Sequence, residues 1–223
     1  MIFNKINTTV GDLGCGMGGT MYYGLKKYPH IHIIGVSLSS FQVLEGNKRM
    51  MNLNGLLLEE NFCNTSFPSE SLDSAYAIES LCHSGHHITA LKEAYRILKP
   101  GANFVIADAF LKKDPDQLCP GSNYCYTQLC KEWNLENLGN IKKVKNSLEQ
   151  IGFKNIIVED ISFRVAPSVF HVPFAITGFI LQKLLKKERF KPQSWKNLKG
   201  SLFSLLSGLH MNSFGYYLIT ATK

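Results

Sequence analysis

The stretch that decides the fold is Val10-Gly11-Asp12-Leu13-Gly14-Cys15-Gly16-Met17-Gly18-Gly19. Apolar residues lead into it, and glycines then recur at positions 14, 16, 18 and 19. Such a run is typical of the turn between a buried strand and a helix, because glycine tolerates positive φ and lets the backbone approach a ligand closely. The run satisfies both G-x-G-x-G and G-x-G-x-x-G, and the second pattern alone is weak evidence for a dinucleotide site.

Two neighbouring features separate the classes of nucleotide site. Asp12 stands two residues before Gly14, where its carboxylate would repel a pyrophosphate but hold a cationic ammonium group. The next apolar segment ends in Gly35-Val36-Ser37, without the acid that a dinucleotide site normally offers to the adenosine ribose. Both features disfavour a nicotinamide-dependent oxidoreductase.

Strand-like and helix-like segments alternate outward from this turn. We expect strands over 6–13, 31–38, 56–63, 72–79, 103–110, 154–163 and 214–221. We expect helices over 20–28, 39–52, 86–98 and 143–151, with Ser39 as the N-cap of the second. This alternation predicts an α/β, Rossmann-like, doubly wound and mostly parallel sheet.

Two segments interrupt the alternation. Residues 112–140 are polar and are expected to form an excursion or lid. Residues 164–212 are expected to be mostly helical, which predicts a main domain of residues 1–163 and 213–223 with a helical lid or substrate-binding insertion over 164–212.

Composition excludes several classes of protein. The 223 residues are 45% hydrophobic and 18% charged, unlike a disordered tail, and no collagen-like period or heptad run is present. The formal charge of +7 comes from scattered lysines and arginines, without the basic stripe and interleaved aromatics of a nucleic-acid site. We therefore expect no nucleic-acid partner.

The cysteines and the N-terminal residues bear on compartment and metal binding. Residues 1–10 are too polar for a signal core, so we expect reduced thiols and a cytoplasmic chain. Cys119, Cys125 and Cys130 do not have zinc-ligand spacing, and we predict no metal site.

The motifs together resemble class I S-adenosylmethionine-dependent methyltransferases. Asp12 to Gly18 resembles their first motif. Gly35-Val36-Ser37-Leu38-Ser39-Ser40-Phe41-Gln42 resembles the G-[IV]-[ST]-x-S-x-x-Q form of a subgroup that includes tocopherol, sterol, cyclopropane-fatty-acid and sugar methyltransferases. Further resemblances lie at residues 67–73, 78–83 and 91–101, so the likeness covers residues 8–110.

The resemblance implies about seven strands, the last antiparallel, and S-adenosyl-L-methionine as cofactor. The residues that it implies for cofactor binding are Asp12, Gly14, Cys15, Gly16, Gly18, Ser37, Leu38, Gln42, Asn61, Phe62 and Glu79. Among them, the glycines would cradle the methionine portion, Asp12 would lie near its amino group, Ser37 and Gln42 would reach the ribose, and Asn61 and Phe62 would contact adenine. Local alternatives stay open, because Ser37 could cap the next helix and Gln42 could be a surface helix residue.

The candidate catalytic residues are Glu79, His83 and Asp108, at the expected carboxyl ends of two strands. In sugar O-methyltransferases of the subgroup, a His after the fourth strand and an Asp in an A-D-[FA] segment are proposed as bases, and His83 and Asp108 match those positions. The alternative is that His83 and Glu79 only shape the cofactor pocket. His86 and His87 are expected at an exposed helix start.

Residues 168–185 are apolar but reach only the lower length limit for a membrane span, and Pro173 and Gln182 interrupt them. We expect no transmembrane span there. Three alternatives remain: a lid over an apolar acceptor, a helix packed against the sheet, or an interfacial segment with Lys183, Lys186, Lys187 and Arg189 at the lipid headgroups.

The predicted function is methyl transfer to a small, fairly apolar acceptor, on oxygen or carbon, of natural-product, prenyl-lipid or sugar-like type. The alternatives are a cofactor-binding but catalytically impaired or partner-dependent protein and, less favoured, a nucleic-acid methyltransferase. Only nine residues precede Val10, whereas the subgroup usually has helices there, so we expect weak cofactor binding by this chain. Peripheral membrane contact and a homodimer both remain open.

Overall fold

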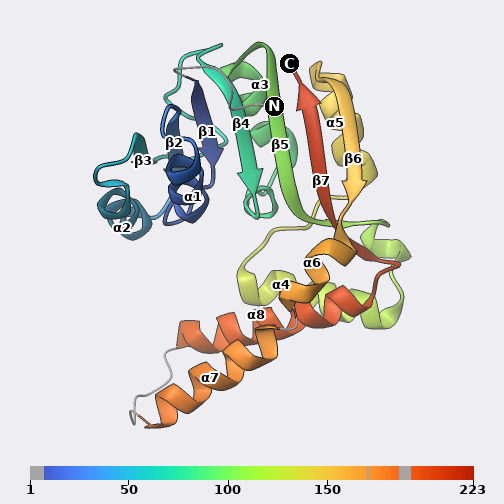
Figure 1. Cartoon of the computed structure of the whole chain (residues 1–223). Helices are drawn as coiled ribbons and strands as arrows, with labels where there is room; N and C mark the ends of the chain where they lie inside the picture. The colour runs from blue at the N-terminus through green and yellow to red at the C-terminus, as the bar shows by residue number, and fades with distance from the viewer. Residues whose placement is uncertain (1–7, 170, 186–191) are drawn as a thin grey trace. The chain divides into compact units, whose positions relative to one another are not determined.

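A seven-stranded mixed sheet organises the computed structural model, which describes residues 8–169, 171–185 and 192–223. The sheet order is β3-β2-β1-β4-β5-β7-β6 (Figure 1). The strands are β1 Thr9–Leu13, β2 His32–Ser37, β3 Gly55–Glu59, β4 Leu72–Ile78, β5 Leu98–Leu111, β6 Lys154–Asp160 and β7 Phe214–Thr222. The helices are α1 Gly19–Lys27, α2 Ser40–Met50, α3 His87–Ile97, α4 Pro120–Trp133, α5 Ile141–Ile151, α6 Ser162–Val169, α7 His171–Leu185 and α8 Pro192–Leu209, with short 3-10 turns η1 Leu81–His83 and η2 Pro115–Gln117.

Strand directions confirm the predicted mixed sheet. β1 pairs in parallel with both β2 and β4, and β4 pairs in parallel with β5. Gly101 N donates to Lys223 O at 2.9 Å and Lys112 N donates to Ser213 O at 2.8 Å, so β7 runs antiparallel to β5 (Figure 1). The chain order reverses between β1 and β4, which makes that edge the topological switch point where open α/β sheets bind ligands.

The core around β1 to β3 explains the apolar sequence pattern. One cluster of buried residues joins the strands to α1 and α2: Val10, Met21, Leu25, Ile31, Ile33, Met50 and Leu57. Ser39 caps α2 as predicted, because its Oγ accepts a hydrogen bond from Gln42 N at 3.3 Å.

Several element boundaries differ from the sequence predictions. The strand expected over 56–63 ends at Glu59, because the side chain of Asn61 accepts the backbone N–H of Cys63 and turns the chain. The strand expected from residue 103 begins at Leu98, directly after α3. The polar excursion over 112–140 contains α4, which has Pro120 in its first turn. Residues 6–7 of the first expected strand, with Lys186, Lys187 and Arg189, lie outside the described residues.

The chain forms two compact units. The first contains the described residues up to Asp108, Lys142–Glu159 and Leu218–Lys223, and the second contains Ala109–Ile141 and Asp160–Tyr217. The predicted insertion, 164–212, lies within the second unit, which also includes the polar segment with α4.

α4 and α8 pack closely inside the second unit. Tyr124 and Phe203 make an edge-on ring contact, with centroids 5.9 Å apart. A Cβ added at Gly200 would collide with the indole of Trp133, so this indole packs against α8 where the helix has no side chain.

The cysteines in the described ranges lie in unequal environments. All six cysteines are free, and burial raises the pKa of Cys15 to about 12. Cys119 is exposed at the N-terminus of α4, where the hydroxyl of Ser122, at 3.1 Å from its Sγ, lowers the thiol pKa. Within these ranges, no group of three His, Cys, Asp or Glu side chains could hold a metal ion.

We predict that Gly200→Ala destabilises the second unit by about 1–3 kcal/mol, because the new methyl group forces α8 away from Trp133. Thermal unfolding measures the effect. The matched control is Gly208→Ala in the same helix, where an added Cβ meets nothing within 4 Å and helix propensity favours alanine. Equal unfolding temperatures for the two variants would contradict the packing argument.

Candidate functional site

The glycine turn follows β1 in a conformation that needs glycine at two positions in particular. Gly14 has φ +97°, and a Cβ there would collide with the side chain of Ser80 at the end of β4. Gly16 has φ +53° with open space around it, so its backbone conformation rather than crowding requires glycine. Gly14 N and Cys15 N both donate to Val36 O, at 3.1 and 2.9 Å, which ties the turn to β2. The backbone is therefore held close to the sheet edge, where a ligand can approach it.

Asp12 is the buried carboxylate of this edge. It pairs in register with Gly35 of β2 and Tyr76 of β4, and only 3% of its surface is exposed. Burial raises the pKa of Asp12 to about 7, and the nearby Tyr76 side chain opposes the rise. Among the described residues, the Tyr76 hydroxyl has no hydrogen-bond partner. A cationic ligand would favour the ionised form of Asp12, because its positive charge would replace the hydration that the carboxylate loses on burial.

Ser37 and Gln42 contact each other at the end of β2. Ser37 Oγ donates to Gln42 Oε1 at 2.7 Å and accepts the N–H of Ser39 at 3.3 Å. Ser37 is buried, Gln42 is half-buried and Leu38, between them in sequence, is exposed. The structure thus brings the predicted pair together, and the N-cap role falls to Ser39 rather than Ser37.

The loop after β3 carries the two residues predicted to contact adenine. Asn61 is exposed and its Oδ1 accepts the N–H of Cys63 at 2.9 Å, whereas Phe62 is buried. Asn61 is thus accessible to a ligand, whereas most of the Phe62 side chain is not.

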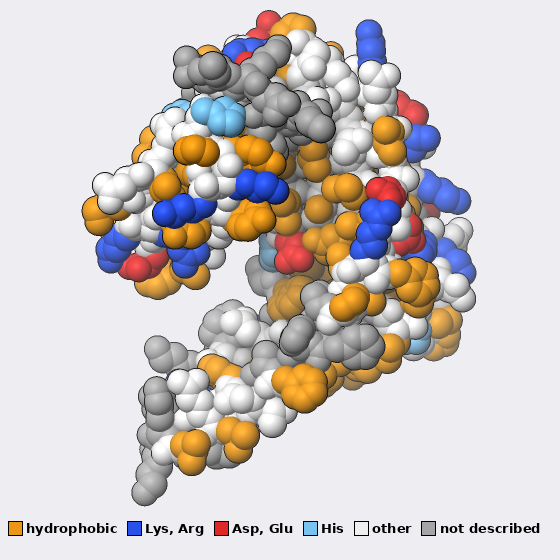
Figure 2. Space-filling view, viewed as in Figure 1, with side chains coloured by type: hydrophobic (Ala, Val, Ile, Leu, Met, Phe, Trp, Pro, Cys, Tyr) orange, Lys and Arg blue, Asp and Glu red, His pale blue; other side chains and the backbone are white. Residues whose placement is uncertain are grey.

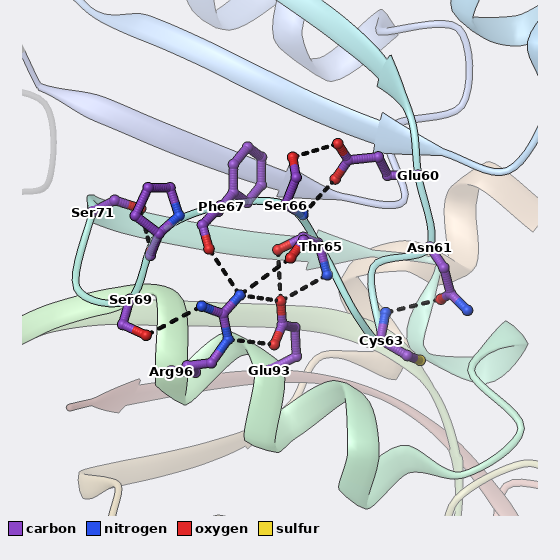
Figure 3. A network of polar contacts seen from close by, with 11 residues as sticks. Glu60, Asn61, Cys63, Thr65, Ser66, Phe67, Ser69, Ser71, Glu93 and Arg96 are labelled. Atoms are coloured by element: carbon purple, nitrogen blue, oxygen red, sulfur yellow. Dashed lines mark hydrogen bonds and ion pairs between the residues drawn. The ribbon is translucent and has the colours of Figure 1, made fainter.

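A polar network that sequence reasoning missed holds this loop (Figure 3). Buried Glu93 of α3 accepts Thr65 N and Thr65 Oγ1, at 2.8 and 2.6 Å. Arg96 donates to both carboxylate oxygens of Glu93, at 2.8 and 2.7 Å, and to Phe67 O at 2.8 Å. Burial alone would raise the pKa of Glu93, but the hydrogen bonds from Arg96 and Thr65 outweigh it and hold that pKa below 4.5. The only sequence signal was the i, i+3 spacing of an acid and an arginine on one helix.

The three candidate catalytic residues lie at the adjacent ends of β4 and β5. Ile78 pairs with Ala107, so Glu79 and Asp108 follow at the same level of the sheet. Glu79 is exposed and has φ +51°, an uncommon conformation of the kind that functional sites often hold. Asp108 is 2% exposed, and its Oδ2 accepts Cys82 N at 3.0 Å, within η1.

His83 ends η1 with an exposed side chain. The protein atoms around it still remove part of its hydration, and this burial lowers its pKa below 6.5. At neutral pH the imidazole is therefore uncharged and able to accept a proton. The hydrogen bond from Cys82 N to Asp108 fixes the turn that carries His83. His86 is the N-cap residue of α3 and is exposed, as predicted. His87, the first residue of α3, was also expected to be exposed but is half-buried.

Comparison with known proteins agrees with this geometry. Residues 11–106 match the family described as "Methyltransferase domain". With this match, a mostly parallel sheet and a glycine turn after the acid at the end of β1, the chain belongs to the class I S-adenosylmethionine-dependent methyltransferases.

Individual relatives fall within this class. An O-methyltransferase of Aspergillus nomiae is 32% identical over 156 residues, which cover 67% of this chain and 66% of that protein. The sterol 24-C-methyltransferase of Eremothecium gossypii is 25% identical over 171 residues, covering 75% of this chain and 45% of that protein. The cycloartenol-C-24-methyltransferase of Arabidopsis thaliana is 27% identical over 228 residues, covering 89% of this chain and 64% of that protein. The chain thus spans between about half and two thirds of the length of these sterol relatives.

Solved structures share the fold. Phosphoethanolamine N-methyltransferase 2 of Haemonchus contortus, in complex with S-adenosyl-L-methionine, superposes with a TM-score of 0.80 at 18% identity, covering 99% of this chain and 50% of that one. Geranyl diphosphate C-methyltransferase of Streptomyces coelicolor superposes with a TM-score of 0.73 at 18% identity, covering 99% and 74%.

We predict that Arg96→Leu destabilises the chain by about 3 kcal/mol at pH 7, because it leaves the Glu93 carboxylate buried without its ion pair. In the unsubstituted chain the lowered pKa of Glu93 gives stability that is present above pH 4.5 and is lost as the pH falls through the folded value. The loss of stability between pH 7 and pH 4 should therefore be smaller in the variant than in the unsubstituted chain. Thermal unfolding at pH 7 and pH 4 measures both effects.

The control for this experiment is Lys92→Leu, an exposed position on the same helix. Its effect should stay within about 0.5 kcal/mol. A comparable loss in both variants would show that the network does not hold the loop.

Proposed function

We propose that the chain binds S-adenosylmethionine at the edge formed by β1, β2 and the loop after β3, and transfers a methyl group to a small apolar acceptor. The observation that carries the proposal is buried Asp12 immediately before the glycine turn. A carboxylate whose charge is otherwise poorly compensated suits the ammonium group of the methionine portion.

The other donors and acceptors at this edge also fit the cofactor. The Ser37 hydroxyl and Gln42 amide offer polar partners to ribose hydroxyls without the usual acid. Asn61 offers an exposed amide to the adenine. The open space around Gly16, where an added Cβ would meet nothing within 4 Å, leaves room for the amino-acid portion. Cys15, Gly18, Leu38, Phe62 and Glu79 complete the proposed cofactor-binding set.

When bound, S-adenosylmethionine supplies a sulfonium-activated methyl group. The protein must then align the acceptor and, for a hydroxyl acceptor, remove its proton. Neutral His83 is the proposed base, because it is exposed and its pKa lies below the usual value. Asp108 is proposed as a positioning residue that acts through Cys82 N.

The apolar class of acceptor rests on the relatives and on the second unit. The relatives include sterol and cycloartenol C-methyltransferases and an O-methyltransferase, and one structural neighbour is in complex with geranyl diphosphate. We propose that residues 164–212 form the acceptor-binding insertion, with residues 1–163 and 213–223 as the cofactor-binding domain. A sterol, prenyl-lipid or ring hydroxyl is the proposed type of acceptor.

The second candidate is a protein that binds the cofactor without methyl transfer. The [4+2]-cyclase SpnF superposes with a TM-score of 0.74 at 20% identity, so one protein with this fold is named for a different reaction. Cofactor binding without turnover on any acceptor would favour this candidate.

We predict that Asp12→Asn weakens binding of S-adenosylhomocysteine at least tenfold, because the ammonium group loses its carboxylate. The dissociation constant of the unsubstituted chain should fall as the pH rises from about 6 to 8, as Asp12 ionises. Isothermal titration calorimetry measures both.

The same variant separates binding from folding. The folded pKa of Asp12 is raised from 3.8 to about 7, so its ionisation costs stability progressively as the pH rises between these values. Asp12→Asn should therefore stabilise the chain by about 2–4 kcal/mol at pH 8 and much less at pH 4. Loss of binding together with loss of stability would indicate misfolding instead of a lost contact.

We predict that His83→Ala lowers kcat on a hydroxylated sterol or prenyl phenol by about 10²–10⁴-fold, the usual contribution of a general base. The dissociation constant of the His83→Ala variant for S-adenosylhomocysteine should differ less than twofold from that of the unsubstituted chain. The control is His86→Ala, three residues further along the chain. A parallel loss of cofactor binding would instead assign His83 to the cofactor pocket.

A further inference from the structure

Lysines and arginines are scattered along the whole chain, but their excess over acidic residues lies in one segment. Residues 161–217 carry eight basic residues and one acid, Glu188, whereas the rest of the chain carries 16 of each sign. The basic residues are Arg164, Lys183, Lys186, Lys187, Arg189, Lys191, Lys196 and Lys199. This charge of +7 therefore belongs to the segment that contains α6, α7 and α8.

The same segment exposes an apolar face on α7. Phe174, Leu181 and Leu185 are 76%, 53% and 83% exposed, and their spacing of seven and four residues places them on one side of the helix. Gly178 lies on that side too, and an added Cβ would meet nothing within 4 Å. The opposite side is half-buried and includes Ile176, Phe179 and Ile180.

α8 exposes a second apolar stripe. Trp195, Leu202 and Leu209 are exposed and follow one another at intervals of seven residues. Lys196 and Lys199 are exposed beside them. α7 and α8 contact each other within the second unit, and Figure 2 shows apolar side chains on the visible face of this region. Rows of exposed apolar side chains rimmed by charged ones are typical of an interaction site.

We propose that the segment containing α6, α7 and α8 docks on an anionic lipid surface, with the apolar stripes of α7 and α8 at the level of the acyl chains and Lys183, Lys196 and Lys199 at the headgroups. Charge selects this occupant, because a second copy would bring a segment of +7 against another of +7. A polynucleotide would match the charge but not the aliphatic stripes. No helix in the described ranges is long and apolar enough to cross a bilayer, so the contact is interfacial.

This inference goes beyond the proposed function and does not depend on it, because docking requires neither cofactor nor acceptor. The test is co-sedimentation of the full chain, without cofactor, with vesicles of phosphatidylcholine alone or with about 30% phosphatidylserine. We expect binding to the anionic vesicles that weakens at high salt, since the attraction is screened. Fluorescence of Trp195 should shift to the blue on binding, and the shift should be absent from Trp195→Phe.

Two pairs of variants test the stripe and the charge separately. Leu181→Ser with Leu185→Ser should lower the vesicle partition coefficient at least tenfold. The matched control is Ile157→Ser, which is 64% exposed on β6 and should have less than a twofold effect. Lys183→Gln with Lys196→Gln should lower binding about fivefold per charge, whereas Lys92→Gln with Lys154→Gln should change it little.

Several outcomes would overturn the proposal. Absence of binding to anionic vesicles at low salt would do so directly, as would equal losses in the test and control variants. If the leucine variants turn a dimer into a monomer and leave vesicle binding unchanged, the face is an interface between copies. If DNA binds the chain and the leucine variants leave vesicle binding unchanged, the segment is a polyanion site instead. Circular dichroism and thermal unfolding of each variant show that it remains folded.

Discussion

The Ser80 hydroxyl sets the geometry on which the candidate site depends. It donates to Leu13 O at 2.5 Å, between the ends of β1 and β4, and thereby occupies the space that a Cβ of residue 14 would need. The glycine turn and the end of β4 are thus fixed by one contact at the switch point of the sheet. Glu79 precedes Ser80 in the chain and η1 follows it. The same contact therefore positions the glycine turn and the segment that carries the candidate catalytic residues Glu79 and His83. A side chain at residue 14 would disturb both.

Local patterns predicted the strands and the central turn, whereas the antiparallel direction of the last strand was expected from the family resemblance. Glycine spacing at 14, 16 and 18 and the apolar run over 31–38 report on backbone conformation and burial at their own positions. The start of β5 at Leu98 was not predictable in this way, because Pro100 and Gly101 read as a helix stop, and only pairing with β4 and β7 extends the strand. A strand end that is set by pairing with a neighbouring strand cannot be predicted from the residues around it alone.

The candidate site divides along the same line. The sequence identified Asp12, Ser37 and Gln42 individually, since each matches a motif position. It did not indicate that Ser37 and Gln42 hold each other, or that Asp108 is bound to the backbone of η1. The Glu93–Arg96 network was missed because its partners, Thr65 and Phe67, lie some thirty residues earlier in the chain. The sequence therefore indicated which residues belong to the site. The hydrogen-bond partners of these residues could be found only from the three-dimensional structure.

The unequal environments of the six thiols have a practical chemical consequence. The pKa is raised by burial at five of them, Cys15, Cys63, Cys82, Cys125 and Cys130, and lowered at exposed Cys119. Thiolates rather than thiols react with alkylating agents, so Cys119 is the natural first target. A maleimide dye or spin label would therefore attach to the second unit at a single position without any cysteine having to be removed. The thiols beside the glycine turn and η1 would stay unmodified as long as the chain is folded.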